Sequence, residues 1–231
     1  MTCTITPPDY SSAAYLGAYS RINAMVIVGE GLADRHFRLL ADAIPEDAES
    51  LQVLAAMEGR HARDFVGCGV QLGVKPDAPL ARRLFAPLHA LFLEANRAGD
   101  RVACLVIQCL IVESFAVAAY RCYLPVADAY AGPVTVEVLK DEALHLGYGE
   151  DWLRPRFQEV AEEVVACCHR AVPVALGMLE RLKPDLETIG IAPAELVGEF
   201  IACFQEALVA IGYSPASSRQ VLSELAAAAL A

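Results

Sequence analysis

Apolar residues recur along most of the chain at the three- and four-residue spacing that gathers them on one face of a helix. Proline and glycine interrupt this pattern, and they mark where the helices are expected to end. The pattern therefore predicts an all-α protein. It contains about eight helices, with expected ranges of about 11–43, 47–72, 80–98, 100–123, 133–153, 157–182, 193–211 and 215–230.

Two features of the pattern could oppose helix formation. The stretch VTVEVL (134–139) has the composition of a β-strand, but a single strand among helices would have no partner. Pro87 and Pro173 lie inside predicted helices and are expected to kink them. We therefore expect helices throughout, two of them bent.

The run VACLVIQCLIVESFAVAAY (102–120) is long and apolar enough to cross a membrane. It contains Gln108, Glu113 and Ser114, however, and a glutamate near the centre of a bilayer is costly. The alternative is a central helix that is buried on all sides. We expect the buried helix, and the membrane segment stays open as the second interpretation.

Composition narrows the class of protein further. A chain of 231 residues suits one domain, spanning 1–231. The net charge of −11 repels phosphate backbones, so nucleic acid is not an expected partner. The N-terminus lacks the features of a secretory signal, and none of the eight cysteines forms a C-x-x-C pair. We therefore expect a protein of the reducing cytoplasm without a disulfide framework.

Two Glu-x-x-His pairs carry the candidate chemistry. Glu58 and His61 form the first, and Glu142 and His145 form the second. Residues three positions apart share one face of a helix, so each pair could bind one metal ion. Either pair alone is more typical of a solvent-exposed helix face.

Two further glutamates lie in strongly apolar helical stretches. Glu30 precedes the first pair and Glu113 precedes the second. The two single glutamates are 83 residues apart, and both members of the Glu-x-x-His pair recur after 84 residues. A buried carboxylate is costly unless it is paired or bound to metal. The order therefore indicates a repeated helix pair that supplies six ligands to one buried site.

This arrangement is the pattern of ferritin-like proteins that hold two carboxylate-bridged metal ions in a four-helix core. Oxygen and imidazole donors suit iron or manganese, and an all-thiolate site is excluded because no cysteine cluster is present. Four carboxylates can largely neutralise two divalent cations, and open coordination positions would remain for dioxygen. The predicted metal ligands are Glu30, Glu58, His61, Glu113, Glu142 and His145.

Several longer motifs resemble one family in particular, the cyanobacterial aldehyde-deformylating oxygenases, also called aldehyde decarbonylases. The motifs include AYSRINAMVIVGE, MEGRHARDFVGCG, LVIQCLIVESFAVAAY and KDEALHLGYGEDWL, and the resemblance covers nearly the whole chain. It implies a ferritin-like fold of eight helices, two iron ions and a hydrophobic tunnel. It also implies conversion of a long-chain fatty aldehyde and dioxygen to an alkane one carbon shorter plus formate.

The resemblance implies partners and further site residues as well. The partners are a ferredoxin-type electron donor and an acyl-carrier-protein reductase that supplies the aldehyde to a monomeric enzyme. The residues around the ligands are Arg60, Gln108, Tyr120 and Asp141, with Cys68 near the substrate tunnel. One position departs from the family, which usually has a tyrosine where this chain has Phe37. A hydroxyl group near a metal ligand is therefore expected to be missing.

Apolar residues near the predicted ligands could form the approach for a substrate. The predicted substrate-contacting residues are Ile27, Phe65, Cys68, Ala116 and Val117. Ordinary core packing explains such residues equally well. His36 and His89 lie in mixed polar stretches, and we expect both on the surface.

Three classes of function remain open from the sequence. The first is the aldehyde oxygenase, and the second is another di-iron oxidase that binds a fatty acid. The third is iron handling, as a ferroxidase or a storage protein. The apolar ligand helices argue against the third, because iron storage needs a polar entry path.

Overall fold

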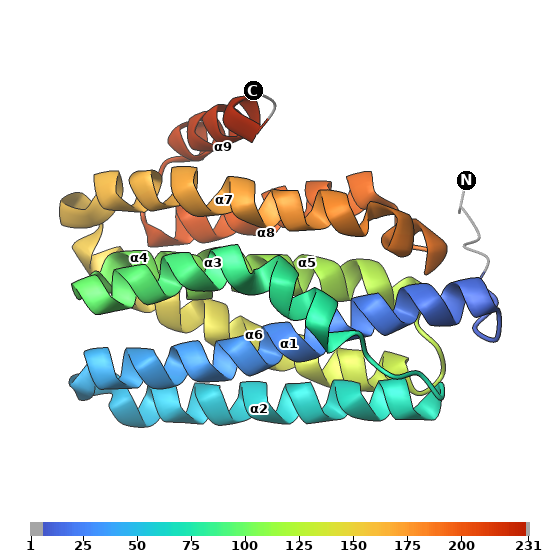
Figure 1. The fold of residues 1–231 in the computed structure, drawn as a ribbon. Helices are drawn as coiled ribbons and strands as arrows, with labels where there is room; N and C mark the ends of the chain where they lie inside the picture. Colours follow the sequence, from blue (N-terminus) through green and yellow to red (C-terminus); the bar gives the residue numbers. More distant parts are fainter. Residues whose placement is uncertain (1–6, 230–231) are drawn as a thin grey trace.

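The computed structural model describes residues 7–229, and within that range it contains helices and no strand (Figure 1). The predicted all-α fold is confirmed. The helices are α1 (Ala13–Ala43), α2 (Ala48–Gln71), α3 (Ala78–Ala98), α4 (Arg101–Leu105), α5 (Glu113–Tyr123), α6 (Ala131–Leu153), α7 (Phe157–Thr188), α8 (Pro193–Ile211) and α9 (Pro215–Ala229). A π-helical turn, η2 (Val106–Val112), joins α4 to α5.

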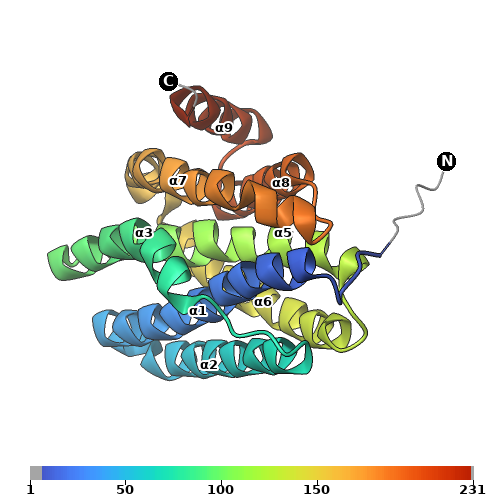
Figure 2. The same ribbon diagram turned by 45° about the vertical axis from the view of Figure 1, so that its right-hand side comes forward.

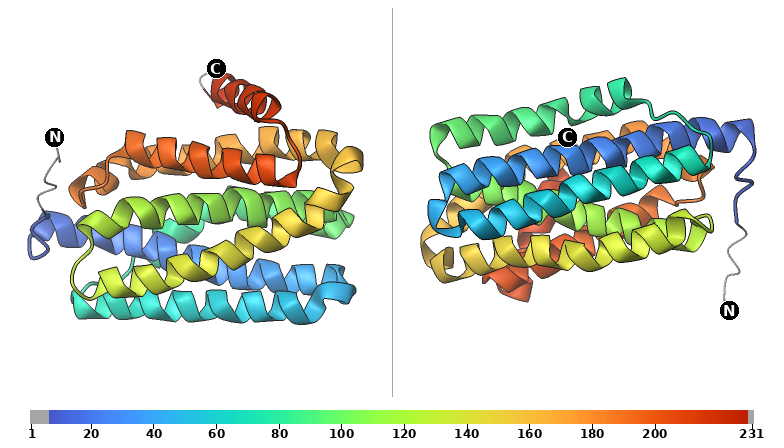
Figure 3. Two further views of the ribbon diagram at one scale, coloured as in Figure 1. Left: turned by 180° about the vertical axis from the view of Figure 1, so that it is seen from behind. Right: turned by 90° about the horizontal axis from the view of Figure 1, so that it is seen from below.

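The core that holds the candidate site consists of α1, α2, α6 and the continuous helix formed by α4, η2 and α5. Helix α1 packs along α2, α6 lies beside both α2 and α5, and the views from behind and below show these contacts (Figure 3). Helices α3 and α7 cover this core on the side of α1 and η2, and α8 packs against α5. Helix α9 packs on α7 and α8 at the outside of the bundle (Figure 2).

The sequence sets several helix ends through local capping. The side chains of Ser12, Asp77 and Asp100 each accept a backbone N–H at the start of a helix, which satisfies donors that have no partner within the helix. Gly99 ends α3 with a φ angle of 73°, a left-handed conformation that glycine adopts without steric cost. These caps explain why the predicted boundaries of α1 and α3, and the predicted start of α4, lie within two residues of those observed.

Helix α7 extends six residues beyond its predicted end. The sequence predicts an end at Leu182, but the helix continues through Pro184 to Thr188. Leu186 is buried on the inner face of these last turns, and the Asp185 carboxylate accepts two hydrogen bonds from Arg21 of α1, at 2.6 and 2.8 Å. Tertiary contacts thus outweigh the weak local stop signal. The helical prediction for 134–139 is confirmed, since these residues lie within α6.

The apolar run of residues 102–120 forms the centre of the bundle. The continuous helix Arg101–Val126 is long and apolar enough to cross a membrane by length and composition, yet 78% of its most apolar window is buried inside the protein. Surrounding helices supply that burial, which favours the core-helix interpretation.

A glycine allows α6 to approach this central helix closely. A Cβ atom at Gly149 would lie 2.3 Å from the Cβ atom of Cys109 in η2, so no larger residue fits there without movement of the backbone. The close approach carries His145, one turn earlier on α6, into the core beside Glu113.

Candidate metal centre

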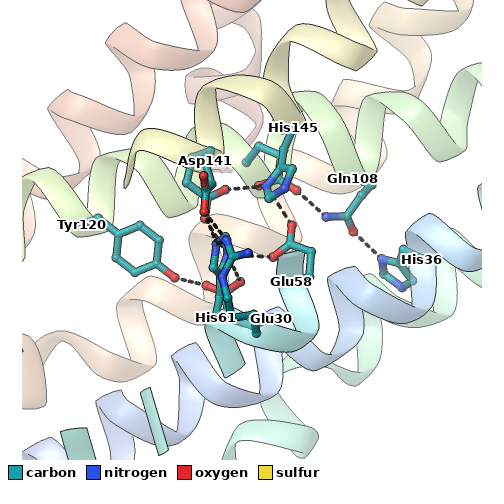
Figure 4. Close-up of polar contacts among 11 residues, drawn as sticks. Glu30, His36, Glu58, His61, Gln108, Tyr120, Asp141 and His145 are labelled. Atoms are coloured by element: carbon teal, nitrogen blue, oxygen red, sulfur yellow. Dashed lines mark hydrogen bonds and ion pairs between the residues drawn. The ribbon is translucent and has the colours of Figure 1, made fainter. Parts of the chain in front are cut away.

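The six predicted ligands meet at one buried point inside the bundle. Helices α1 and α5 each contribute one glutamate, and α2 and α6 each contribute a glutamate and a histidine (Figure 4). None of the six side chains exposes more than 6% of its surface. The repeated spacing in the sequence thus corresponds to two helix pairs that face each other across the core.

The donor atoms form two overlapping groups. Glu30, Glu58, His61 and Glu142 make up the first, and Glu58, Glu113, Glu142 and His145 make up the second. Within each group the donor atoms lie within 4.8 Å of one another. Glu58 and Glu142 belong to both groups, so two cations held here would share these two carboxylates.

Both imidazoles turn the same nitrogen toward the carboxylates. His61 Nδ1 lies 3.5 Å from Glu58 Oε2 and 3.6 Å from Glu142 Oε1. His145 Nδ1 lies 3.0 Å from Glu58 Oε1 and 3.0 Å from Glu142 Oε2. A cation placed between each imidazole and the shared carboxylates would contact nitrogen and oxygen donors together, as iron and manganese sites require.

Several of these atoms lack hydrogen-bond partners among the described residues. They are both carboxylate oxygens of Glu58, His61 Nδ1 and Glu142 Oε1. A buried polar atom without a partner is unusual and costs free energy. A pair of divalent cations would satisfy all four, so the residues present fit a di-metal centre.

Burial also controls the charge of the cluster. It raises the pKa of Glu58, Glu113 and Glu142 well above the usual range, and the neighbouring carboxylates raise it further. Burial acts in the same direction at Glu30, but its contacts with Glu58 and His61 outweigh that effect and lower the pKa of Glu30. The metal-free cluster therefore holds protons that a cation must displace.

Metal binding should consequently release protons at neutral pH. The raised pKa values mean that the carboxylates bind protons in the metal-free protein and lose them on coordination, so the apparent metal affinity should rise with pH. Calorimetric titration with Fe²⁺ without oxygen, in two buffers of different ionisation enthalpy, measures the number released. We expect release of about one proton or more per chain. Identical heats of Fe²⁺ binding in both buffers would contradict this expectation.

Two side chains at the surface side of the cluster hold His61 in place. His61 Nε2 lies 3.1 Å from Asp141 Oδ2, and Arg60 donates a hydrogen bond to the same carboxylate. A carboxylate on the outer nitrogen of a ligating histidine fixes the ring orientation and leaves Nδ1 free for metal. Arg60 and Asp141 therefore lie where the sequence places them, against a ligand.

Two more side chains hold the single glutamates. The Tyr120 hydroxyl donates a hydrogen bond to Glu30, and the Gln108 amide Nε2 donates to Glu113 Oε1 at 2.7 Å. Burial raises the pKa of Tyr120 well above its ordinary value, so the hydroxyl keeps its proton. All four predicted supporting residues thus contact a predicted ligand.

An apolar cavity of about 100 Å³ opens onto the carboxylates. Glu30, Glu58 and Glu113 line it together with Tyr120 and with apolar side chains from α1, α3, η2, α5 and α7. A second cavity of about 60 Å³ lies next to it and shares Val26, Ala119 and Tyr120 as lining residues. The metal cluster therefore faces an apolar space that suits a hydrocarbon chain better than a hydrated ion.

Comparisons with known proteins identify the family. The long-chain fatty aldehyde decarbonylase family matches residues 12–231. The chain belongs to that family. A solved structure from Synechococcus, described as a protein with aldehyde deformylating oxidase activity, is 54% identical, covers 94% of this chain and 99% of its own, and superposes with a TM-score of 0.93. The predicted ferritin-like bundle and the resemblance stated from the sequence are confirmed.

The predicted substrate residues of this fatty aldehyde decarbonylase lie at different distances from the cavities. Ala116 lines the main cavity, and Phe65 lines the second and stacks on Tyr120 with ring centroids 5.4 Å apart. Ile27, Cys68 and Val117 line neither cavity. These three pack in or against the hydrophobic core instead.

Sequence reasoning missed the far wall of the main cavity. Phe85 and Leu88 of α3 and Ala175, Met178 and Leu182 of α7 line it. Neither helix carries a predicted ligand, so no local signal connects these residues to the metal site. Only the packing of α3 and α7 over α1 and η2 brings them there.

The prediction that His36 lies on the surface is wrong. Its side chain is 3% exposed and stacks on Phe92 with ring centroids 3.7 Å apart. The mixed polar sequence around it misleads because α3 covers that face of α1. His89 of α3 is half-buried beside it rather than fully exposed.

Phe37 lies where the resemblance stated from the sequence implies a tyrosine, and it packs beside the second predicted ligating histidine. Its ring is fully buried and lies 5.5 Å from the His145 ring, centroid to centroid. His145 Nε2 has no hydrogen-bond partner among the described residues. His145, the second predicted ligating histidine, thus lacks the outer support that Asp141 gives His61.

Phe37→Tyr should strengthen the site. The added hydroxyl would lie toward His145 and accept a hydrogen bond from its Nε2–H, and outer partners of ligating histidines are typically worth about 10- to 100-fold in metal affinity or activity. We expect Fe²⁺ affinity or turnover to rise about tenfold. Anaerobic calorimetry measures the Fe²⁺ affinity, and an activity assay measures the turnover. A variant that folds but gains in neither would show that Nε2 needs no such partner.

Proposed function

We propose that this chain is a di-iron aldehyde-deformylating oxygenase. It converts a long-chain fatty aldehyde to an alkane one carbon shorter plus formate, using dioxygen and external electrons. The observation that carries the proposal is a buried cluster of four glutamates and two histidines, three of whose glutamates line an apolar cavity. Membership of the fatty aldehyde decarbonylase family supports the same reaction.

The six clustered side chains would hold two iron ions. Glu30 and His61 would bind one, Glu113 and His145 the other, and Glu58 and Glu142 both. When bound, such a metal pair supplies dioxygen binding and reduction. The oxygen and imidazole donors, and the absence of cysteine from both donor groups, support iron in this role.

The protein's own residues bind the substrate and exclude water. The apolar walls formed by Val26, Phe85 and Met178 would hold the hydrocarbon chain, which places the aldehyde carbon at Glu30 and Glu113. Water gains little from entering an apolar cavity. The protonated Tyr120 hydroxyl holds Glu30 in position beside the space where the aldehyde would lie.

The partners and location follow from the same proposal. A ferredoxin-type protein would supply electrons, and an acyl-carrier-protein reductase would supply the aldehyde to a monomeric, cytoplasmic enzyme. The net charge of −11 supports the absence of a nucleic-acid partner. The seven described cysteines are all free, which supports a reducing compartment.

Two other functions are compatible with the ligands alone. A generic di-iron oxidase would use the same cluster, and a ferroxidase would need a polar route for iron. The apolar lining of both cavities disfavours the ferroxidase.

Product analysis with a labelled aldehyde tests the proposal. Iron-loaded protein is supplied with a long-chain aldehyde labelled at C1, a ferredoxin reducing system and oxygen. We expect labelled formate and an unlabelled alkane one carbon shorter in equal amounts. Unchanged aldehyde, or labelled fatty acid without alkane, would favour the generic di-iron oxidase. Protein without iron serves as the control.

A further inference from the structure

A line of hydrogen bonds connects one predicted metal ligand to the outer face of the bundle. Gln108 Oε1 lies 2.5 Å from His36 Nδ1, and His36 Nε2 lies 2.8 Å from His89 Nδ1 (Figure 4 shows the inner part). Together with the Gln108–Glu113 contact, this line links α5, η2, α1 and α3. His89 is the only one of its members that solvent reaches to an appreciable extent.

The direction of each hydrogen bond follows from the charge of Glu113. A carboxylate that binds metal can only accept, so the Gln108 amide must present its NH₂ group to Glu113 and its oxygen to His36. His36 Nδ1 must then carry the hydrogen of the neutral ring and donate a hydrogen bond to Gln108 Oε1. His36 Nε2 is left as an acceptor, and His89 Nδ1–H donates to it. One arrangement of protons therefore satisfies the whole line.

Local structure makes this line possible. Residues five positions apart point about 140° apart around a regular α-helix, so Gln108 could not reach Glu113 there. The π-helical turn η2 brings the two side chains onto one face. Phe92 stacks on His36 and fixes the plane of its ring. Burial lowers the pKa of His36 to about 3, so the ring is neutral and has only one N–H to donate.

We propose that His36 is a positioning residue for the metal centre, acting through Gln108 on Glu113, with His89 fixing its tautomer. This inference rests on the proposed role of Glu113 as a metal ligand. The line orients groups and does not conduct protons, because a proton cannot pass through the Gln108 amide without forming an unstable tautomer. Without His36, the buried Gln108 oxygen loses its donor and the amide is free to turn its oxygen toward Glu113, where the two would repel.

A pair of substitutions separates the two nitrogens of His36. In His36→Asn the side-chain amide nitrogen can replace Nδ1 and donate to Gln108, whereas in His36→Gln the longer amide reaches His89 instead. Each variant loses one of the two hydrogen bonds of His36. If His36 only stabilised the fold, both variants should therefore change Fe²⁺ affinity equally. Our proposal predicts that His36→Asn keeps the Fe²⁺ affinity of the unmodified protein and that His36→Gln lowers it. His36→Leu removes both contacts, and His169→Leu, at an exposed histidine, is the control.

The measurement is anaerobic calorimetric titration of each full-length variant with Fe²⁺, together with the melting temperature of the metal-free form. We expect one of two Fe²⁺ ions to bind about tenfold more weakly in the Gln and Leu variants. The Asn variant should stay close to the unmodified protein, with melting temperatures of the Asn and Gln forms alike. Equal weakening by Asn and Gln, or no weakening by Leu, would overturn the proposal.

A double-mutant cycle tests whether His36 acts through Gln108. Gln108→Leu alone should weaken the same Fe²⁺ ion, and adding His36→Leu should weaken it no further. Additive losses would overturn the proposal. Fe²⁺ binding by the unmodified protein distinguishes failure of this inference from failure of the proposed function. If the unmodified protein binds no Fe²⁺, the metal site itself is refuted. If it binds two ions tightly and the variants bind them equally well, only the positioning role of His36 is refuted.

Discussion

Replacing Glu58 with Ala should remove both metal ions, whereas replacing Glu113 with Ala should remove one. Glu58 belongs to both donor groups and Glu113 to only one. We expect alkane formation to fall by more than about 100-fold in each variant, since loss of a mere outer partner already costs up to that factor. Metal analysis after iron loading and gel filtration gives the number of ions per chain.

The fold should survive both substitutions. Burial raises the pKa of Glu58 and Glu113 in the metal-free protein, so removing either carboxylate also removes a desolvation cost. Circular dichroism of the metal-free forms checks this expectation. Glu159→Ala, at an exposed position of α7, is the control and should retain two ions. Two ions in the Glu58 variant would contradict the assignment of the bridging ligand.

Filling the main cavity should strongly reduce aldehyde turnover without affecting metal content. Ala116 lies three residues after Glu113 on α5 and lines the cavity of about 100 Å³. Ala116→Phe would place a ring in the space proposed for the hydrocarbon chain. We expect turnover of a long-chain aldehyde to fall at least about tenfold, which is a loss of about 1.4 kcal/mol of binding or transition-state stabilisation. A rise in the Michaelis constant for the aldehyde should account for most of this fall in turnover.

An exposed position provides the matched control for this variant. Val136→Phe adds a ring of the same kind to the outer face of α6, where Val136 is 41% exposed. Overpacking in the Ala116 variant could cost about 1–3 kcal/mol of stability, so its melting temperature and iron content are measured in parallel. A stable, iron-loaded Ala116→Phe protein with unchanged turnover would place the substrate elsewhere.

The metal cluster was predictable from the sequence because its geometry is repeated along the chain. Glu58 and His61 lie on one face of a helix by their spacing alone, and the recurrence at Glu142 and His145 requires two helix pairs that face each other. Buried carboxylates in apolar helices complete the set. Local rules and one repeat therefore sufficed to identify all six clustered residues.

Features that depend on packing between distant segments were not predictable. The polar neighbours of His36 favour an exposed position, and only α3 packing on α1 buries it. The π-helical turn η2 and the continuation of α7 past Pro184 have the same origin, since tertiary contacts override the local preference of the backbone. The cavity wall from α3 and α7 has no signature in either helix taken alone.

The crystal structure of the iron-loaded protein, with anomalous diffraction measured on both sides of the iron absorption edge, tests the central claim most directly. We predict two iron peaks per chain inside the bundle, one contacted by Glu30 and His61 and the other by Glu113 and His145, with Glu58 and Glu142 contacting both. A single peak, or iron bound only at surface residues, would contradict the account.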